Sequence, residues 1–199
     1  MNFKDFYELV IKNRSCRRFD NSYKISHEVL KSLVDLARNC ASASNKQPLK
    51  YIVSRDDNTN ALIFSCLGWA GYLKDWKGPD KNERPSAYII IMGDYNISNN
   101  FWCDHGIAAQ TILLGARSIA LGGCIFGVIN TKKLKQHLNI KDNLQIKLVI
   151  ALGKPIEKIK LEKIDKNKSE KESIKYWRDE NQIHYVPKRE LEDIIIDSF

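Results

Sequence analysis

The chain has 199 residues, of which 43% are hydrophobic and 10% aromatic, and its formal net charge at pH 7 is +8. This composition argues against a disordered protein and predicts one compact domain over residues 1–199. The positive charge is compatible with nucleic acid, a membrane surface or small anionic ligands as partners. Because the lysines are scattered and no long run of like charge occurs, no nucleic-acid partner is expected.

The five cysteines are odd in number, include no C-x-x-C pair and lack the spacing of zinc ligands. With no secretory segment before them, we interpret them as reduced thiols of a cytoplasmic protein, and we expect no metal site. No apolar run approaches the roughly 20 residues that a membrane span requires, so no membrane partner is expected either. The cysteines are Cys16, Cys40, Cys66, Cys103 and Cys124.

The first helix is predicted from Phe3 to Ile11, where apolar residues recur at helical spacing. A basic segment with Arg14, Ser15 and Arg17 follows it. Guanidinium groups form planar, charge-assisted hydrogen bonds with phosphate, and a Ser hydroxyl adds a neutral donor. From these residues alone, a phosphate-binding segment and a solvated basic turn both remain open.

A second helix is predicted to begin after the N-cap residue Ser26. The loop 40–48 that comes next is rich in small residues, which let another molecule approach the backbone, and it leads into a strand over 50–53. Asn45 and Gln47 in this loop each present a hydrogen-bond donor and an acceptor, as reading the edge of a heterocycle requires. A polar turn before a strand is the alternative.

The middle of the chain predicts a helix, an aromatic loop and a buried strand. The helix is expected over 58–67. The loop 68–79 contains two tryptophans and a tyrosine, which either cover a cofactor or pack the loop onto the core. The unbroken apolar run 87–92 is typical of a strand buried on both faces, so we expect helices on both sides of the sheet.

Residues 104–121 form the longest helical pattern, and its small residues allow close helix approach, either in the centre of the fold or across a dimer. The glycine-rich stretch 122–127 is predicted to be a flexible turn leading into an extended segment, whose backbone amides face a planar ligand. Thr131 is expected to cap a short helix. The alternating apolar residues from 146 to 152 predict a strand with these residues on one face.

Lys, Glu and Ile dominate residues 156–172, which we interpret as a solvated, weakly structured connection. A final helix is expected through residues 191–195, with Lys188 and Arg189 at its beginning. Two cations at a helix N-terminus oppose the helix dipole unless an anion lies between them and the free amides. A bound phosphate would explain their position.

Four motifs along the chain can be explained together. They are Arg14-Ser15-x-Arg17-x-Phe19, Ser42-Ala43-x-Asn45-x-Gln47-Pro48, Gly122-Gly123-Cys124 and Pro187-Lys188-Arg189. In this order and at this spacing they resemble the FMN-dependent nitroreductase family over nearly the whole chain, and residues 68–75 are similar to a subgroup signature. Neither a G-x-G-x-x-G motif after a strand nor a P-loop motif occurs, so the sequence supports neither a dinucleotide-binding fold nor a P-loop fold.

The resemblance implies an α+β fold of three layers, in which helices flank a mixed, mostly antiparallel sheet. It also implies a homodimer with one FMN at each interface site. Arg14, Lys188 and Arg189 would then hold the phosphate of FMN. Ser15 and Arg17 would bind its ribityl chain and the pyrimidine side of its ring.

By the same resemblance, three polar side chains approach the flavin, the first two from the partner chain: Ser42, Asn45 and Gln47. Backbone groups near the flavin nitrogen that carries hydride come from Ile125, Phe126 and Gly127. No catalytic acid or base is implied, because FMN performs the redox chemistry. Arg17 is the candidate for stabilising the negative charge of the reduced ring.

The implied activity has two stages, in which NADH or NADPH reduces the flavin and a nitroaromatic, quinone or similar acceptor then takes the electrons. Another flavin reaction on the same scaffold is an alternative: flavin reduction for a partner, reductive dehalogenation or a biosynthetic dehydrogenation. A non-enzymatic FMN-binding or sensor protein is a second. His105, His184 and Cys124 are expected to pack rather than to react, and His27 and His137 are expected on the surface of helices.

Overall fold

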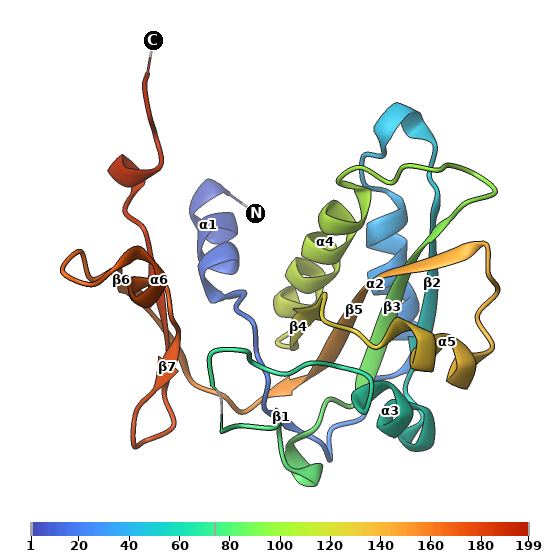
Figure 1. Ribbon diagram of the computed structural model, residues 1–199, viewed down its shortest axis with the longest axis horizontal. Coiled ribbons are helices and arrows are strands. Elements are labelled where there is room, and N and C mark those ends of the chain that lie inside the picture. Colours follow the sequence, from blue (N-terminus) through green and yellow to red (C-terminus); the bar gives the residue numbers. More distant parts are fainter. Residues whose placement is uncertain (1, 74, 199) are drawn as a thin grey trace. The chain divides into compact units, whose positions relative to one another are not determined.

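The computed structural model of the protein describes residues 2–73 and 75–198. The chain forms two compact units, each with its own β-sheet (Figure 1). The first unit comprises Met1–Trp69 and Gly78–Ile156, and the second comprises Ala70–Lys77 and Glu157–Phe199. That the two units act as one domain stays a prediction.

The first unit is built on a five-stranded sheet in the order β1-β5-β3-β2, with β4 also paired to β5. Every one of these pairs is antiparallel. The strands are β1 (Phe19–Asp20), β2 (Leu49–Ser54), β3 (Ala87–Asp94), β4 (Gly122–Phe126) and β5 (Leu144–Pro155). All residues of β3 are buried, as its apolar run predicts.

Four of the five α-helices described in the first unit begin with a polar N-cap that accepts a backbone amide proton, and α4 is the exception. The helices are α1 (Phe3–Lys12), α2 (His27–Arg38), α3 (Asp57–Phe64), α4 (Asp104–Ser118) and α5 (Thr131–Leu138), with the 3-10 turns η1 (Ala43–Asn45) and η2 (Lys81–Glu83). Ser26 caps α2 as expected, by accepting the amide proton of Val29. Thr131 is not the cap of α5: it is the first helical residue, and Asn130 accepts the amide proton of Lys133 instead. Within the described residues, no helix has the length and apolar character needed to cross a membrane.

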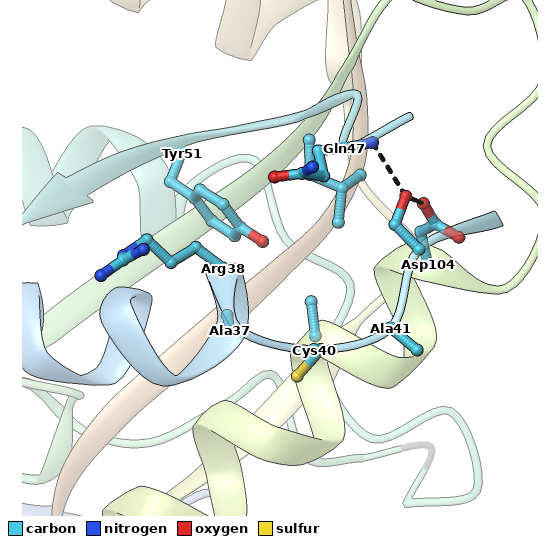
Figure 2. Close-up of a pocket in the computed structure, with 10 residues that line it drawn as sticks. Ala37, Arg38, Cys40, Ala41, Gln47, Tyr51 and Asp104 are labelled. Carbon is cyan, nitrogen blue, oxygen red and sulfur yellow. Dashed lines mark hydrogen bonds between the residues drawn. The ribbon is translucent and has the colours of Figure 1, made fainter. Parts of the chain in front are cut away.

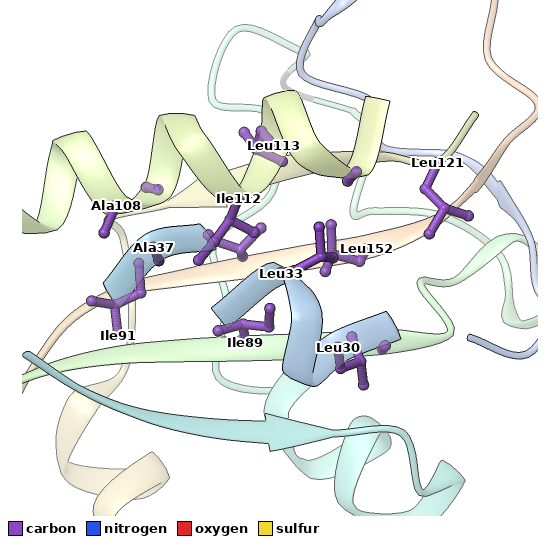
Figure 3. Close-up of a cluster of buried hydrophobic side chains, with 14 of the residues drawn as sticks. Leu30, Leu33, Ala37, Ile89, Ile91, Ala108, Ile112, Leu113, Leu121 and Leu152 are labelled. Carbon is purple, nitrogen blue, oxygen red and sulfur yellow. The ribbon is translucent and has the colours of Figure 1, made fainter. Parts of the chain in front are cut away.

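Alternate residues of β3 feed two hydrophobic cores. On one face, Ile89 and Ile91 pack with α2 and α4 (Figure 3). On the other face, Tyr88 and Ile90 pack with Ile63 of α3 and with α5. The expectation of helices on both sides of the sheet is therefore confirmed. In this arrangement, the C-terminal end of α2 and the N-terminal end of α4 both lie next to the loop between α2 and β2.

Strand β5 contains a bulge that the sequence did not indicate. Met92 pairs with Ile146, while the preceding residue of β3 pairs with Leu148, so that Lys147 is an extra residue. We predicted that Ile146 lies on the same face of the strand as Leu148, Ile150 and Leu152. This prediction is wrong, because Ile146 packs in the core beside α3 and α5. One inserted residue reverses the faces of everything beyond it.

Gly122 and Gly123 begin strand β4 and do not form the flexible turn that we predicted. A Cβ atom at Gly123 would lie against the carbonyl oxygen of Ala151 and 2.7 Å from Cδ2 of Leu113. Glycine is therefore required here because β4 packs closely against β5 and α4, and not because the backbone needs conformational freedom.

Replacing Gly123 with alanine is expected to lower the free energy of unfolding by about 1–3 kcal/mol, because the backbone of β5 cannot yield to a methyl group. Gly106 is the matched control, since a Cβ at this α4 position meets nothing within 4 Å. Its replacement by alanine is expected to raise stability by about 0.5–1 kcal/mol. Urea unfolding of both variants measures the difference, and equal effects would contradict the packing argument.

The second unit has a three-stranded sheet in the order β6-β8-β7. Its elements are β6 (Ile159–Lys163), α6 (Glu170–Ser173), β7 (Trp177–Arg178), β8 (His184–Lys188) and the 3-10 turn η3 (Leu191–Asp193). Strand β6 pairs parallel with β8, and β7 pairs antiparallel with it. Two predictions are thus wrong: residues 156–172 contain a strand, and the expected final helix is only the turn η3.

A buried charged cluster lies inside the second unit. One carboxylate oxygen of Glu157 accepts a hydrogen bond of 2.6 Å from Arg178 and lies 3.1 Å from Nδ1 of His184. The side chains of Glu157 and His184 are 0% and 1% exposed. His184 is thus a packed residue, as expected, and its ring also lies against that of Tyr176.

The aromatic loop packs within the units to which its residues belong. Trp69 contacts Phe126 of β4 in the first unit, with ring centroids 4.6 Å apart. In the second unit, the guanidinium of Arg178 lies 4.3 Å from the ring centroid of Trp76. The packing alternative is confirmed for Trp69, which packs on the core of the first unit, and a role of the loop in covering a cofactor stays a prediction.

Candidate functional site

Arg14 follows Asn13, the C-cap of α1, and its side chain turns back onto that helix. Its Nη2 donates a 2.7 Å hydrogen bond to the carbonyl oxygen of Val10, one of the acceptors left free at a helix end. Its Nε is buried and has no hydrogen-bond partner within the described residues. Burial also lowers the pKa of Arg14, because it disfavours the charged form. This is a cation with donor capacity left for an anion.

Arg18, in the same segment, is paired with a carboxylate. Arg18 donates from Nε and Nη2 to the two carboxylate oxygens of Glu83, at 2.7 Å each. This fork geometry satisfies the guanidinium within the protein. Nη1 of Arg17 donates to the carbonyl oxygen of Ser15 at 3.4 Å.

The first and third sequence motifs lie side by side in the first unit. Ser15 forms a β-bridge with Gly123, and the amide of Cys16 donates to the carbonyl oxygen of Gly123 at 2.9 Å. The basic segment therefore runs along the beginning of β4. The stretch that we expected to offer backbone groups lies at the other end of this strand.

At the end of β4, neighbouring side chains differ in their exposure. Ile125 is 38% exposed, whereas Phe126 is 4% exposed and packs in the core. Any contact of Phe126 with a ligand must therefore come from its backbone. Cys124 is also buried in this core, which suits the packing role that we expected.

The loop between α2 and β2 carries the second motif in an unusual backbone conformation. Ser44, Asn45 and Gln47 have φ of 52°, 52° and 50°, in the left-handed region that non-glycine residues rarely adopt. The Gln47 amide group donates to Oδ1 of Asn45 at 3.1 Å. The two amide side chains that we expected to read a heterocycle are thus next to each other.

Asp104, the first residue of α4, anchors this loop. Its carboxylate accepts the hydroxyl proton of Ser42 at 2.6 Å and the amide proton of Ala43 at 3.1 Å. The Ser42 hydroxyl oxygen in turn accepts the amide proton of Gln47 at 2.9 Å. Figure 2 shows the two hydrogen bonds through Ser42 as dashed lines.

A cavity of about 180 Å³ opens beside the loop. Tyr51 and Gln47 lie on one side of it and Ala37 and Cys40 on the other (Figure 2). Burial, and then the nearby Cys40 and Asp104, raise the pKa of Tyr51 to about 12. Tyr51 therefore offers a neutral phenol at the cavity, with a proton that it can donate.

The loop and the basic segment are fixed to different places on α4. Asp104 holds the loop at the first residue of the helix, whereas Gly123, the neighbour of Ser15, packs against Leu113. Because an α-helix rises about 1.5 Å per residue, these two points lie about 13 Å apart along the axis of α4.

Lys188 and Arg189 belong to the second unit. Lys188 is the last residue of β8, and Arg189 follows it rather than opening a helix. Nη2 of Arg189 donates to Glu170 at 3.1 Å, in an exposed pair. The dipole argument for a phosphate here therefore fails, and their part in phosphate binding stays a prediction from the resemblance.

Comparison with known proteins identifies the family. The model of the nitroreductase family matches residues 10–154. The chain belongs to the nitroreductase family. The resemblance that the four motifs carry is thus confirmed, and this nitroreductase-family protein is an oxidoreductase of that kind.

Two curated relatives of this nitroreductase-family chain carry the same name, "Putative NADH dehydrogenase/NAD(P)H nitroreductase". The protein from Archaeoglobus fulgidus is 27% identical over 156 residues, which are 74% of this chain and 84% of the relative. The protein from Methanothermobacter thermautotrophicus is 28% identical over 160 residues, which are 77% of this chain and 78% of the relative.

Solved structures of the family share the fold. A nitroreductase family protein from Clostridium novyi is 26% identical with a TM-score of 0.61, and the match covers 78% of this chain and 86% of that chain. An FMN-dependent nitroreductase from Clostridium difficile is 22% identical with a TM-score of 0.63, covering 75% and 87%. The expected α+β nitroreductase fold is therefore confirmed.

Sequence reasoning missed Asp104. It treated this residue only as the start of a long helix, because an acidic residue in a first helical turn is common. Its contacts are with residues far away in the sequence, and the sequence carries no local signal for them.

Proposed function

We propose that the protein is an FMN-dependent oxidoreductase that uses NADH or NADPH to reduce nitroaromatic, quinone or similar acceptors. The observation that carries this proposal is Arg14, whose buried Nε lacks a partner within the described residues. A partly buried guanidinium with unused donors suits the phosphate of FMN. The name of the Clostridium difficile neighbour, an FMN-dependent nitroreductase, supports the same cofactor.

Bound FMN would supply the redox chemistry, by taking electrons from the nicotinamide donor and passing them to the acceptor. The protein then has to bind and orient. Arg14 holds the phosphate, while Ser15 and Arg17 bind the ribityl chain and the pyrimidine side of the ring. The guanidinium of Arg17 would offset negative charge on the reduced ring and so favour the reduced state.

Two further segments would orient the ring. The amide side chains of Asn45 and Gln47 approach it with donors and acceptors, and Ser42 belongs to the same loop. The backbone of Ile125, Phe126 and Gly127 offers hydrogen-bonding groups at the end of β4. None of these amide, hydroxyl and backbone groups needs to act as an acid or a base, because FMN would carry out the redox chemistry.

We propose a homodimer in which the loop of one chain meets the basic segment of the other. Their separate anchors on α4 support this arrangement. So does α1, which has no buried residue and exposes Phe3, Phe6 and Tyr7 by 82%, 43% and 57%. Light scattering is expected to give twice the 23.0 kDa chain mass, and a monomer would remove the shared site.

The visible spectrum of the purified protein tests the function. Flavin absorption bands are expected, or are expected to appear as protein-bound flavin after FMN is added. Anaerobic NADH or NADPH should bleach these bands, and a nitroaromatic or quinone should restore them. Bands that neither nucleotide bleaches would instead support a binding or sensor protein. A protein that binds no FMN would overturn the proposal.

A further inference from the structure

The loop 42–47 holds a backbone conformation that its own residues do not favour. Ser44, Asn45 and Gln47 all have φ near 50°. A non-glycine residue in this region costs on the order of 1 kcal/mol or more, so three within one short loop need support from elsewhere. Such clusters of strained residues are typical of sites where the backbone must present groups in a fixed way.

Asp104 provides that support at both ends of the loop. It binds the beginning directly, through the Ser42 hydroxyl and the Ala43 amide. It reaches the end through Ser42, whose oxygen accepts the amide proton of Gln47. Because the Ser42 hydroxyl donates to Asp104 and accepts from Gln47, it is engaged in shaping the loop.

The position of Asp104 suits this role. It is 5% exposed, and as the first residue of α4 it lies where the helix dipole favours a negative charge. A buried carboxylate must be hydrogen-bonded, and the loop supplies a hydroxyl and an amide donor. The carboxylate and the loop therefore stabilise each other.

We propose that Asp104 is a positioning residue for FMN binding: it fixes loop 42–47 so that Asn45 and Gln47 present their amide groups to the flavin. This inference rests on the proposed function. It assigns Ser42 to the same relay, so that the effect of Ser42 on the flavin comes through the shape of the loop. Asp104 itself does not touch the cofactor.

Three variants and one control test the proposal. Asp104→Ala removes both direct hydrogen bonds. Asp104→Asn keeps the shape and can still accept from Ala43 while donating to Ser42. Ser42→Ala removes the hydrogen bond from Ser42 to Asp104 and the one from Gln47 to Ser42, but keeps the bond from the Ala43 amide to Asp104. The control is Asn60→Ala: Asn60 is 6% exposed and also bonds a Ser hydroxyl and a backbone group, but it does so on the face of the sheet that α3 covers.

The first readout is FMN affinity, measured by quenching of FMN fluorescence well below the unfolding temperature. Asp104→Ala is expected to weaken binding at least tenfold and to change the visible circular dichroism of flavin at saturation. Asp104→Asn should stay within about threefold of the unaltered protein, with Ser42→Ala between them. Asn60→Ala should lose stability but keep both flavin signals. Unchanged affinity in Asp104→Ala, or an equal loss in Asn60→Ala, overturns the proposal.

The second readout needs no flavin. Hydrogen exchange of the peptide that contains residues 42–47 should become faster in Asp104→Ala and stay slow in Asn60→Ala. If the unaltered protein binds no FMN, the proposed function fails, and this exchange still decides whether Asp104 fixes the loop. Equal exchange in the unaltered protein and Asp104→Ala overturns the role of Asp104 by itself.

Discussion

Replacing Arg14 with alanine is expected to weaken FMN binding by about 10- to 150-fold. Hydrogen bonds to charged groups contribute about 1.5–3 kcal/mol, and each 1.4 kcal/mol corresponds to a tenfold change in affinity. Within the described residues of the FMN-free protein, Arg14 makes one hydrogen bond, to Val10, and its buried Nε has no partner. Stability without FMN should therefore fall by no more than about 1 kcal/mol.

Arg18→Ala is the matched control, because Arg18 lies in the same segment but is bound to Glu83. Its removal should cost on the order of 2 kcal/mol of stability and leave FMN affinity nearly unchanged in the folded fraction. FMN titration and urea unfolding of both variants separate the two roles. If Arg14→Ala binds FMN as tightly as the unaltered protein does, Arg14 does not hold the phosphate.

Much of the first unit could be predicted because its hydrophobic patterns are local. The apolar run of β3 and the long periodic pattern of α4 each exceed what turns and loops show. The face of Ile146 was lost because the bulge at Lys147 is set by pairing with β3, which no periodicity within β5 reveals. Packing likewise, rather than a turn, explains Gly123.

The second unit was mostly missed for a different reason. Strand β6 does alternate, with Ile159 and Leu161 between charged residues, but Lys and Glu on both sides hide a signal of this length. Its partner β8 is parallel and distant in the sequence. The sequence had no means of showing that Glu157 lies against Arg178 and His184.

For the site, sequence reasoning found segments but not their supports. The motif around Ser15 and the glycines of β4 do meet, as their membership in one site requires. Asn45 and Gln47 of the loop lie next to each other, and their contact with the flavin stays a prediction. Asp104 was missed because a positioning residue acts through tertiary hydrogen bonds, and its chemistry alone does not distinguish it from an ordinary first-turn carboxylate.

Replacing Glu157 with glutamine is expected to destabilise the second unit by about 3–5 kcal/mol. The side chain of Glu157 is fully buried, and its carboxylate accepts a hydrogen bond from Arg178 at 2.6 Å. Loss of the negative charge leaves the Arg178 guanidinium, 8% exposed, without its counter-charge, and an uncompensated buried charge carries this cost. The shape of the side chain is kept, so the effect reports the charge.

Hydrogen exchange of peptides from β6 and β8 measures this cost within the second unit. Glu157→Gln should speed their exchange by more than about 100-fold, while peptides from β3 keep their rates. Glu172→Gln is the control, since the side chain of Glu172 is 62% exposed and its Oε1 lies 4.0 Å from Nζ of Lys175. An exposed pair of this kind contributes less than about 1 kcal/mol. Equal exchange in both variants would mean that the buried cluster does not hold the sheet together. Faster exchange in Glu157→Gln alone would show that this cluster stabilises a segment which looks like a solvated connection in the sequence.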